Sequence, residues 1–212
     1  MLKHISKADL LAFDQRFRAH FMNSITGFKS ANLIGSKSTD GFENLAIFNS
    51  FVHLGANPPY IGFILRPTTV ERHTYDNILN TNYFTINHIR TSFIKEAHHT
   101  AAKFPKEVSE FDACGLTPEY KNDFYAPYVM ESYIKMGLKY AKSYEIDLNG
   151  TILVAGEVLD IWIKEDLIEN DGNVRLDKAE SVAISNLDSY YKTERLARFE
   201  YAKPENTPKE LS

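Results

Sequence analysis

The chain has 212 residues, a net charge of −4 at pH 7 and one cysteine, Cys114. This length allows a core that needs no disulfide or metal staples, and a single cysteine excludes an internal disulfide framework and a Cys-based zinc site. The weakly acidic charge gives no global basic field for binding nucleic acid or an anionic membrane.

The first residues, Met1 to Asp9, contain no continuous apolar stretch, so no signal peptide is predicted. The purest long apolar stretch, Thr151–Ile163, is interrupted by Glu157 and Asp160. It is also shorter than the roughly 20 residues that a membrane-spanning helix needs. We therefore expect a cytoplasmic protein.

The chain begins with a pattern typical of a helix. Ser6 is a plausible N-cap with Asp9 three residues later, and Phe13, Phe17 and Phe21 follow at four-residue steps. We expect an N-terminal helical segment over about residues 6–22.

Strand patterns follow. Residues 30–36 and 44–54 read as a hairpin around a polar turn, and residues 60–65 read as a short central strand. Thr74 is expected to be the N-cap of a short helix over 74–79, before a strand over 83–89 and a helix over 91–103. Residues 111–127 read as a loop.

Two long strands are predicted near the end of the chain, over 128–147 and 151–163. Asn149-Gly150 between them is a favourable dipeptide for a tight turn. Residues 165–187 read as irregular, and the tail over about 205–212 is expected to fray. The pattern favours one domain over residues 1–212, mainly β with short helices, in which the strands form an antiparallel barrel.

Several chemical motifs are absent. The ten glycines include no Gly-x-Gly pair, so the sequence has neither a dinucleotide fingerprint nor a Walker-type loop. A zinc-protease helix and a nucleophile elbow are also missing. His98 and His99 are adjacent, and adjacent residues on a helix diverge by about 100°, so we predict no metal site. Cys114 reads as a structural thiol.

Polar residues interrupt an apolar strand at Phe48-Asn49-Ser50-Phe51. Small polar side chains between two phenylalanines could present hydrogen-bonding groups and apolar walls to a planar heteroaromatic ligand. A core strand with a bulge explains the same residues and is the alternative interpretation.

A second segment runs from Leu65 to Thr74. Arg66 ends an apolar strand, and Thr74 is expected to open a helix whose backbone N–H groups are free. An arginine, hydroxyl groups and a helix N-terminus can bind a phosphate without a glycine loop. Arg72 and His73 could add positive charge, whereas an ordinary charged surface loop is the alternative interpretation.

These segments, in order, resemble the flavin reductase-like, FMN-binding split-barrel family. The resemblance runs through residues 30–36, 44–51, 57–59, 74–78 and 83–87. It continues at residues 110–118, a linker typical of the flavoredoxin-like branch, and ends at Gly156-Glu157-Val158. It therefore covers about residues 25–165.

The resemblance implies a split β-barrel that acts as a homodimer, with FMN near the subunit interface. Its implied cofactor-binding residues are Asn32, Phe48, Asn49, Ser50, Phe51, Arg66, His73, Thr74, His98 and Thr100. Phe48 to Phe51 would run along the isoalloxazine ring, and Arg66, His73 and Thr74 would lie near the phosphate. His98 and Thr100 would approach the flavin of the partner chain. His73 replaces the basic residue, lysine or arginine, that usually precedes the threonine.

The activity implied is hydride transfer from NAD(P)H to flavin N5, with electrons passed to free flavin, oxygen or a partner protein. No catalytic acid or base is required. The alternatives are a flavin-binding electron carrier or flavin store, a pyridoxamine-phosphate oxidase-like enzyme, and an interaction barrel with an empty site.

Overall fold

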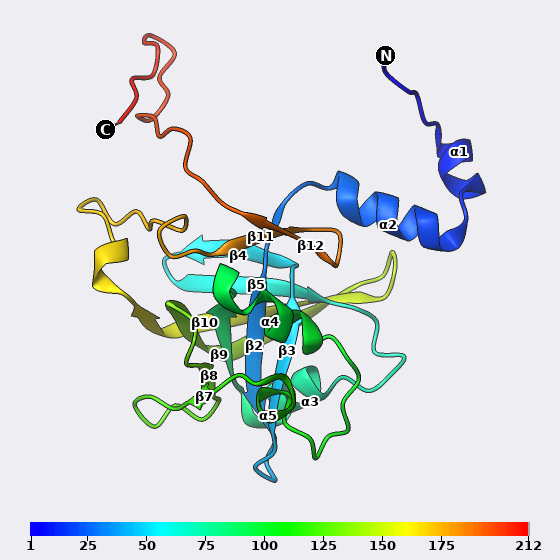
Figure 1. Ribbon diagram of the computed structural model, residues 1–212, viewed down its shortest axis with the longest axis vertical. Helices are drawn as coiled ribbons and strands as arrows, with labels where there is room; N and C mark the ends of the chain where they lie inside the picture. Colours follow the sequence, from blue (N-terminus) through cyan, green and yellow to red (C-terminus); the bar gives the residue numbers. More distant parts are fainter. Residues whose placement is uncertain (212) are drawn as a thin grey trace.

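The protein is built on one seven-stranded antiparallel sheet, in the order β3-β2-β6-β9-β10-β5-β4. Its coordinates are a computed structural model that describes residues 1–211. The strands of this sheet are β2 (Asn32–Lys37), β3 (Glu43–Phe48), β4 (Phe51–Ala56), β5 (Pro59–Leu65), β6 (Tyr83–His88), β9 (Ile134–Ile146) and β10 (Thr151–Ile163). The expected mainly β, antiparallel architecture is confirmed (Figure 1).

The remaining elements surround this sheet. Short strands are β1 (Lys29–Ser30), β7 (Pro118–Glu119), β8 (Tyr128–Val129), β11 (Val182–Ser185) and β12 (Ser189–Lys192). The helices are α1 (Lys7–Ala12), α2 (Gln15–Ile25), α3 (His73–Thr81), α4 (Ile94–His99) and α5 (Glu110–Cys114), with 3₁₀ turns at Thr91–Phe93 and Glu165–Leu167. β11 lies in the segment that was expected to be irregular.

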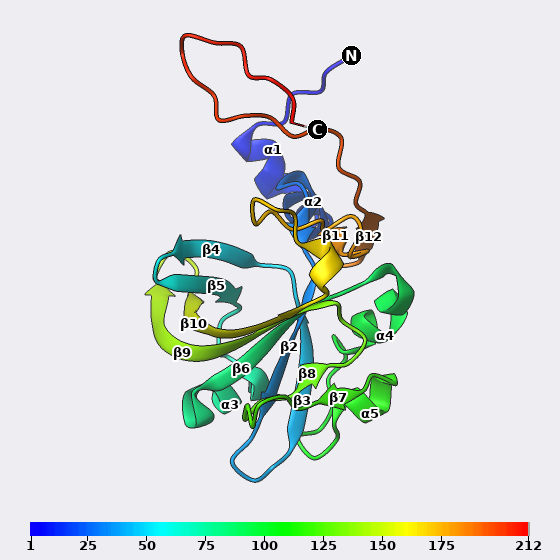
Figure 2. The same ribbon diagram turned by 90° about the vertical axis from the view of Figure 1, so that its left-hand side faces the viewer.

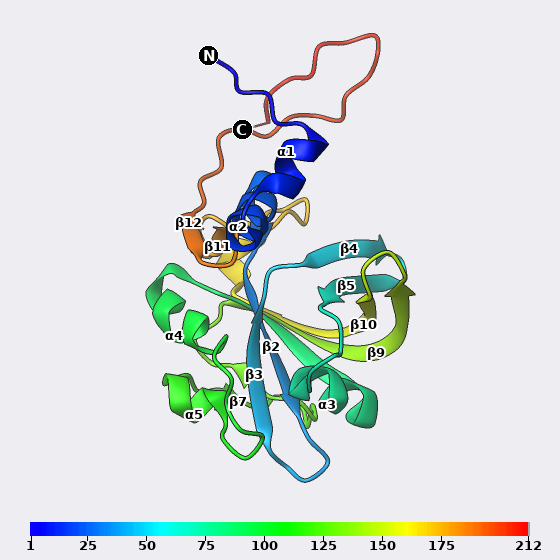
Figure 3. The same cartoon turned by 90° about the vertical axis from the view of Figure 1, so that its right-hand side faces the viewer.

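The sheet curls so strongly that its two edge strands, β3 and β4, come next to one another in the chain. β3 and β4 are consecutive in sequence yet occupy opposite edges, and only Asn49 and Ser50 separate them. The Ser50 hydroxyl donates to the Ile64 carbonyl at 2.8 Å, which fixes this crossing against β5. The single strand expected over 44–54 is therefore wrong, because it is divided into β3 and β4. The central position expected for 60–65 is confirmed, because β5 pairs with β10 on one side and with β4 on the other. Figures 2 and 3 show the resulting open barrel.

The long strands β9 and β10 bend around the barrel. The tight turn between them places Gly150 at φ +69°, a left-handed conformation that glycine adopts freely. The register between β9 and β10 shifts at Ala155/Gly156, and a Cβ on Gly156 would lie 2.6 Å from Cζ of Phe84. A bulge at Ala141 of β9, opposite Gly156, and the missing side chain of that glycine thus let β10 curve closely over the core.

Apolar side chains fill the inside of the barrel and a second layer outside it. The inner cluster includes Ile34, Phe63, Phe84, Leu138 and Val154, each at most 1% exposed. The outer cluster lies between the sheet and helices α4 and α5, and its members include Leu33, Leu45, Phe93, Phe111 and Ile184. The two clusters hold the strands and helices around the cavity described below.

Both ends of the chain lie outside this body. Ser6 and Asp9 form the expected capping box at α1, but the helical segment is two helices, and the second extends to Ile25. Neither α1 nor α2 contains a buried residue. The two helices and the C-terminal segment project beyond β11 and β12 (Figures 1 and 3). No helix within residues 1–211 is long and apolar enough to cross a membrane.

Candidate functional site

An open cavity of about 740 Å³ lies between β3, the end of β5, the start of α3 and the segment that follows α4. Its walls include Asn23, Asn44, Ala46, Ile47, Phe48, Asn49, Ser50, Ile64, Leu65, Arg66, Arg72, His73, Thr74, Thr100, Lys103, Phe104, Glu110 and Leu187. The volume falls within the range of cavities that hold cofactors or drug-sized ligands.

The free edge of β3 forms one side of the cavity. Because β3 pairs with β2 alone, its other edge is open, and the Leu45 N–H on that edge donates to Oε2 of Glu110 at 2.9 Å. Successive backbone amides point alternately to the two sides of a strand, so the amide and carbonyl of Ile47 point the same way as those of Leu45. The edge therefore presents backbone hydrogen-bonding groups along the cavity.

The polar residues after β3 are partly engaged by the protein. Asn49 donates through Nδ2 to the Asn186 carbonyl at 2.7 Å, and the Ser50 hydroxyl bonds with the backbone of Ile64. Their side chains thus hold the crossing between the two sheet edges. What they can still offer a ligand is chiefly backbone groups and the side-chain oxygen of Asn49, while Phe48 supplies an apolar wall.

Positive charge collects at another end of the cavity, where α3 begins. Arg66 is exposed, whereas Arg72 and His73 are half-buried, and all three line the cavity. Nε of Arg72 is buried and has no hydrogen-bond partner within residues 1–211. α3 has nine residues, and the amides of its first turn add a partial positive charge. This combination suits a phosphate group.

The start of α3 is fixed by a buried polar network. Arg72, and not Thr74, occupies the N-cap position, so the expected cap is wrong. Thr74 instead lies inside the helix, where its Oγ1 accepts from Nδ2 of Asn44 at 2.9 Å. Nδ2 of Asn77 donates to the Ser36 hydroxyl at 3.2 Å. These bonds tie α3 to β2 and β3 and leave the Thr74 hydroxyl proton free to donate.

Glu110 brings a buried carboxyl group to the cavity. It is 6% exposed, and burial raises its pKa, opposed by the Leu45 N–H and by the positive charge of His73. Burial raises the pKa of the Cys114 thiol, and the neighbouring Glu110 carboxylate raises it further. Cys114 is therefore a poor nucleophile, in keeping with the structural role expected for it.

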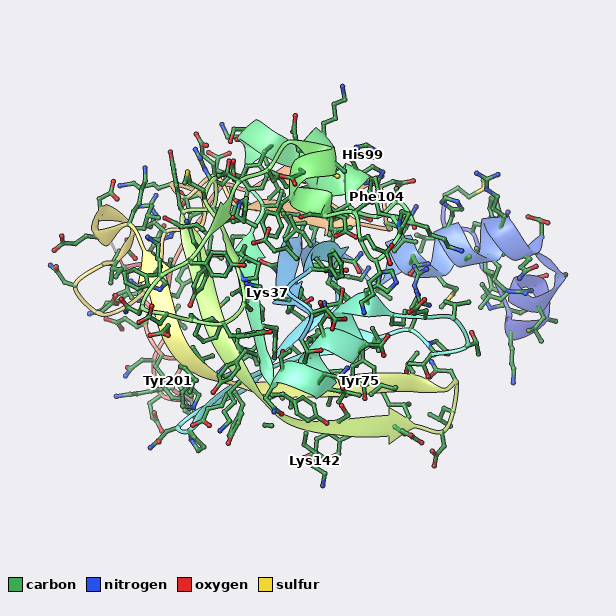
Figure 4. The ribbon with its side chains drawn as sticks, turned by 90° about the horizontal axis from the view of Figure 1, so that it is seen from below. Lys37, Tyr75, His99, Phe104, Lys142 and Tyr201 are labelled. Carbon is green, nitrogen blue, oxygen red and sulfur yellow. The ribbon has the colours of Figure 1, made fainter. Side chains whose placement is uncertain are left out.

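The segment after α4 closes another side of the cavity. Thr100 is buried and donates through Oγ1 to the Ala97 carbonyl at 2.8 Å. His99 and Phe104 meet edge to face with ring centroids 5.5 Å apart, which braces this segment (Figure 4). Lys103, one residue before Phe104, adds a cation to the wall.

Seven of the ten predicted cofactor-binding residues line the cavity, and three do not. The seven are Phe48, Asn49, Ser50, Arg66, His73, Thr74 and Thr100.

The other three lie elsewhere. Asn32 is buried on β2 opposite Phe48, and its Oδ1 has no partner among the described residues. Phe51 packs on Phe63 in the barrel interior, with ring centroids 5.9 Å apart. His98 bonds through Nδ1 with the Tyr190 hydroxyl at 3.0 Å, in a separate surface depression.

The cavity residues that were not predicted as site residues include Asn23, Arg72, Lys103 and Glu110. Arg72 was named only as an additional charge. Asn23 and Glu110 come from segments far from β3 in sequence, so no local pattern could have indicated them. Residues 1–211 contain no group of three or more His, Cys, Asp or Glu side chains that could hold a metal ion.

Comparison with known proteins agrees with this geometry. Residues 29–179 match the family model described as flavin reductase like domain. A structure from Shewanella frigidimarina NCIMB 400, assigned as a flavin reductase with split barrel domain, is 47% identical and has a TM-score of 0.91. The match covers 94% of this chain and 100% of that one.

Two more distant structures share the fold. Nitrilotriacetate monooxygenase component B from Bacillus cereus is 20% identical with a TM-score of 0.80, over 95% of this chain and 99% of that chain. Flavoredoxin of Desulfovibrio vulgaris is 24% identical with a TM-score of 0.69, over 84% of this chain and 91% of that chain. The split-barrel architecture expected from the sequence is confirmed.

Proposed function

The chain belongs to the family of flavin reductase like domains, and we propose that it is an FMN-dependent oxidoreductase that takes hydride from NAD(P)H. Electrons would pass from the reduced flavin to free flavin, oxygen or a partner protein. The observation that carries this proposal is the cavity itself, which joins an open strand edge to a cationic helix start.

The residues present fit FMN. The unpartnered Nε of Arg72 and the amides at the start of α3 suit the phosphate. The free edge of β3 offers amide and carbonyl groups in line, which match the alternating acceptors and donors at the edge of an isoalloxazine ring. Phe48 offers an apolar contact to the ring.

We assign these residues to binding and orientation. Arg66, Arg72, His73 and the Thr74 hydroxyl hold the phosphate, and the backbone from Ile47 to Ser50 orients the ring. FMN supplies the hydride-accepting chemistry when it is bound. Backbone N–H groups aimed at the ring favour negative charge on it, because fixed dipoles in a cavity need no reorganisation.

We also propose that the chain acts as a homodimer. β4 is a short edge strand that exposes Leu54 at 43%, and small barrels of this kind commonly cover such edges in a partner. The expected approach of His98 to a partner's flavin belongs to this proposal. Thr100, by contrast, lines the cavity of its own chain.

The decisive experiment is anaerobic mixing of the FMN-loaded protein with NADH or with NADPH. A reductase bleaches the absorbance of bound flavin near 450 nm on the timescale of its steady-state turnover. A flavin that is bound but not bleached by either nicotinamide would identify an electron carrier or a flavin store. Failure to retain or bind FMN at micromolar concentration would refute the assignment of the cavity.

A further inference from the structure

Helix α2 lies against its own body by its polar side. His20 contacts Asn186 between Nδ1 and Nδ2 at 2.8 Å, and Asn23 lines the cavity. At 100° per residue, Phe17, Phe21 and Ile25 share the roughly opposite side of the helix. The usual arrangement of an amphipathic helix on a core is therefore reversed, because its apolar side faces away from the body.

This apolar side is preformed as an aromatic cluster. Phe13 and Phe17 meet edge to face at 4.8 Å, and Phe17 stacks with Phe21 at 6.3 Å between ring centroids. Phe17 is nonetheless 56% exposed and Ile25 63% exposed. An isolated helix of 11 residues is marginal in water, so α2 needs a surface that covers this side.

Charge indicates what that surface is. Residues 1–28 carry four Lys or Arg against two Asp or Glu, whereas the rest of the chain carries 20 against 26. The N-terminal arm, residues 1–28, is thus cationic and the body, residues 29–212, is anionic. Two arms would repel one another, and an anionic membrane would repel the body. The body of a second copy complements the arm.

The body also displays apolar side chains to solvent. Leu159, at a bulge in β10, and Ile161, two residues later, are 48% and 60% exposed. In a two-fold dimer each arm would reach the partner's body, so the contact would be made twice. Figures 2 and 3 show α1 and α2 beyond one end of the barrel, with α2 next to β11 and β12.

We propose that the N-terminal arm docks through Phe17, Phe21 and Ile25 on the anionic body of a second copy of this chain. Because each arm docks on the other copy, the two arms are exchanged. This exchange holds α2 in place, and with it Asn23 at the wall of the cavity. The inference depends on the exposed arm and its charge, and it stands whether or not the cavity binds FMN.

The first experiment measures the dimer dissociation constant by sedimentation of flavin-free protein across a concentration series. Phe17→Asp/Ile25→Asp should raise this constant at least 30-fold, because apolar anchors at the centre of an interface dominate its energy. The matched control, Gln15→Asp/Ala19→Asp, adds the same charge at two exposed positions of α2 that lie away from its apolar side, and it should change the constant less than threefold. A wild-type monomer, or equal effects of both variants, would overturn the proposal.

The second experiment identifies the surface on which the N-terminal arm docks. Mixed ¹⁴N- and ¹⁵N-labelled full-length chains are joined by a zero-length carbodiimide, which links amines to carboxylates. Mixed-isotope links from Lys3 or Lys7 to a carboxylate within residues 29–212 are expected. Links confined to one chain, or joining arm to arm, would refute the exchange. Flotation of a monomeric chain with anionic phosphatidylserine vesicles would instead make the arm a lipid anchor, which also overturns the proposal.

Discussion

Replacing Arg72 by alanine tests the cationic end of the cavity. Nε of Arg72 is buried without a partner among residues 1–211, and the side chain's only hydrogen bond there is a long one, 3.4 Å from Nη2 to the Pro67 carbonyl. A hydrogen bond to a charged group contributes about 1.5–3 kcal/mol, which corresponds to about 10- to 150-fold in affinity. Because Arg72 is only half-buried, we expect Arg72→Ala to weaken FMN binding by about 10- to 30-fold.

The assay compares two ligands that differ only in the phosphate. Flavin-free wild-type and Arg72→Ala proteins are titrated with FMN and with riboflavin, and bound ligand is followed by flavin fluorescence. Riboflavin affinity should change less than twofold. Arg72→Lys is the matched control, since it keeps the positive charge but loses the planar guanidinium that can make two parallel hydrogen bonds. Its FMN affinity should lie between those of Arg72→Ala and the wild type.

A structural role for Arg72 would give a different result. The long contact with Pro67 implies that its loss costs little stability, so the melting temperature of the flavin-free variant should stay within about 2 °C of the wild type. Equal losses of FMN and riboflavin affinity, or early melting with unchanged FMN affinity, would refute the phosphate site at the start of α3.

Three further predictions follow from single side chains. Arg66→Ala should weaken FMN binding by up to about tenfold and leave riboflavin unchanged in the same titration, because Arg66 is exposed. Burial raises the pKa of Glu110 in the folded protein, so ionisation of this carboxyl group lowers the stability of the fold as pH rises. Glu110→Gln keeps an acceptor for the Leu45 N–H, so its melting temperature should exceed that of the wild type at pH 8 and equal it at pH 4. Burial lowers the pKa of His88 to about 4, so stability should fall as pH drops from 6.5 towards 4, and His88→Gln should flatten that slope in urea unfolding.

The sequence predicted the elements whose signals are local. The turn at Asn149-Gly150, the long strands beside it and the capping box at Ser6 depend on residues adjacent in the chain. The break between β3 and β4 was missed because the polar residues Asn49 and Ser50 were read as an interruption within one strand over 44–54. Only pairing with β2 on one side and β5 on the other separates them.

The site residues divide in the same way. Those contributed by residues 48–50 and 66–74 were predicted, because each segment carries its own polar or charged pattern. The N-cap at Thr74 was wrong because Asn44, thirty residues earlier, holds that hydroxyl inside the helix. Glu110 reaches the edge of β3 across 65 residues of sequence, and that approach is decided by the packing of α5.

The open edge of β3 has a consequence for handling the protein. Unpaired backbone groups on an edge strand invite strand addition by another molecule, and Glu110 blocks that edge at Leu45. Beyond Leu45, the bound ligand would itself be the cover. Preparations stripped of ligand should therefore aggregate through β3 sooner than loaded ones, so the cofactor would protect the solubility of the chain as well as equip it for chemistry.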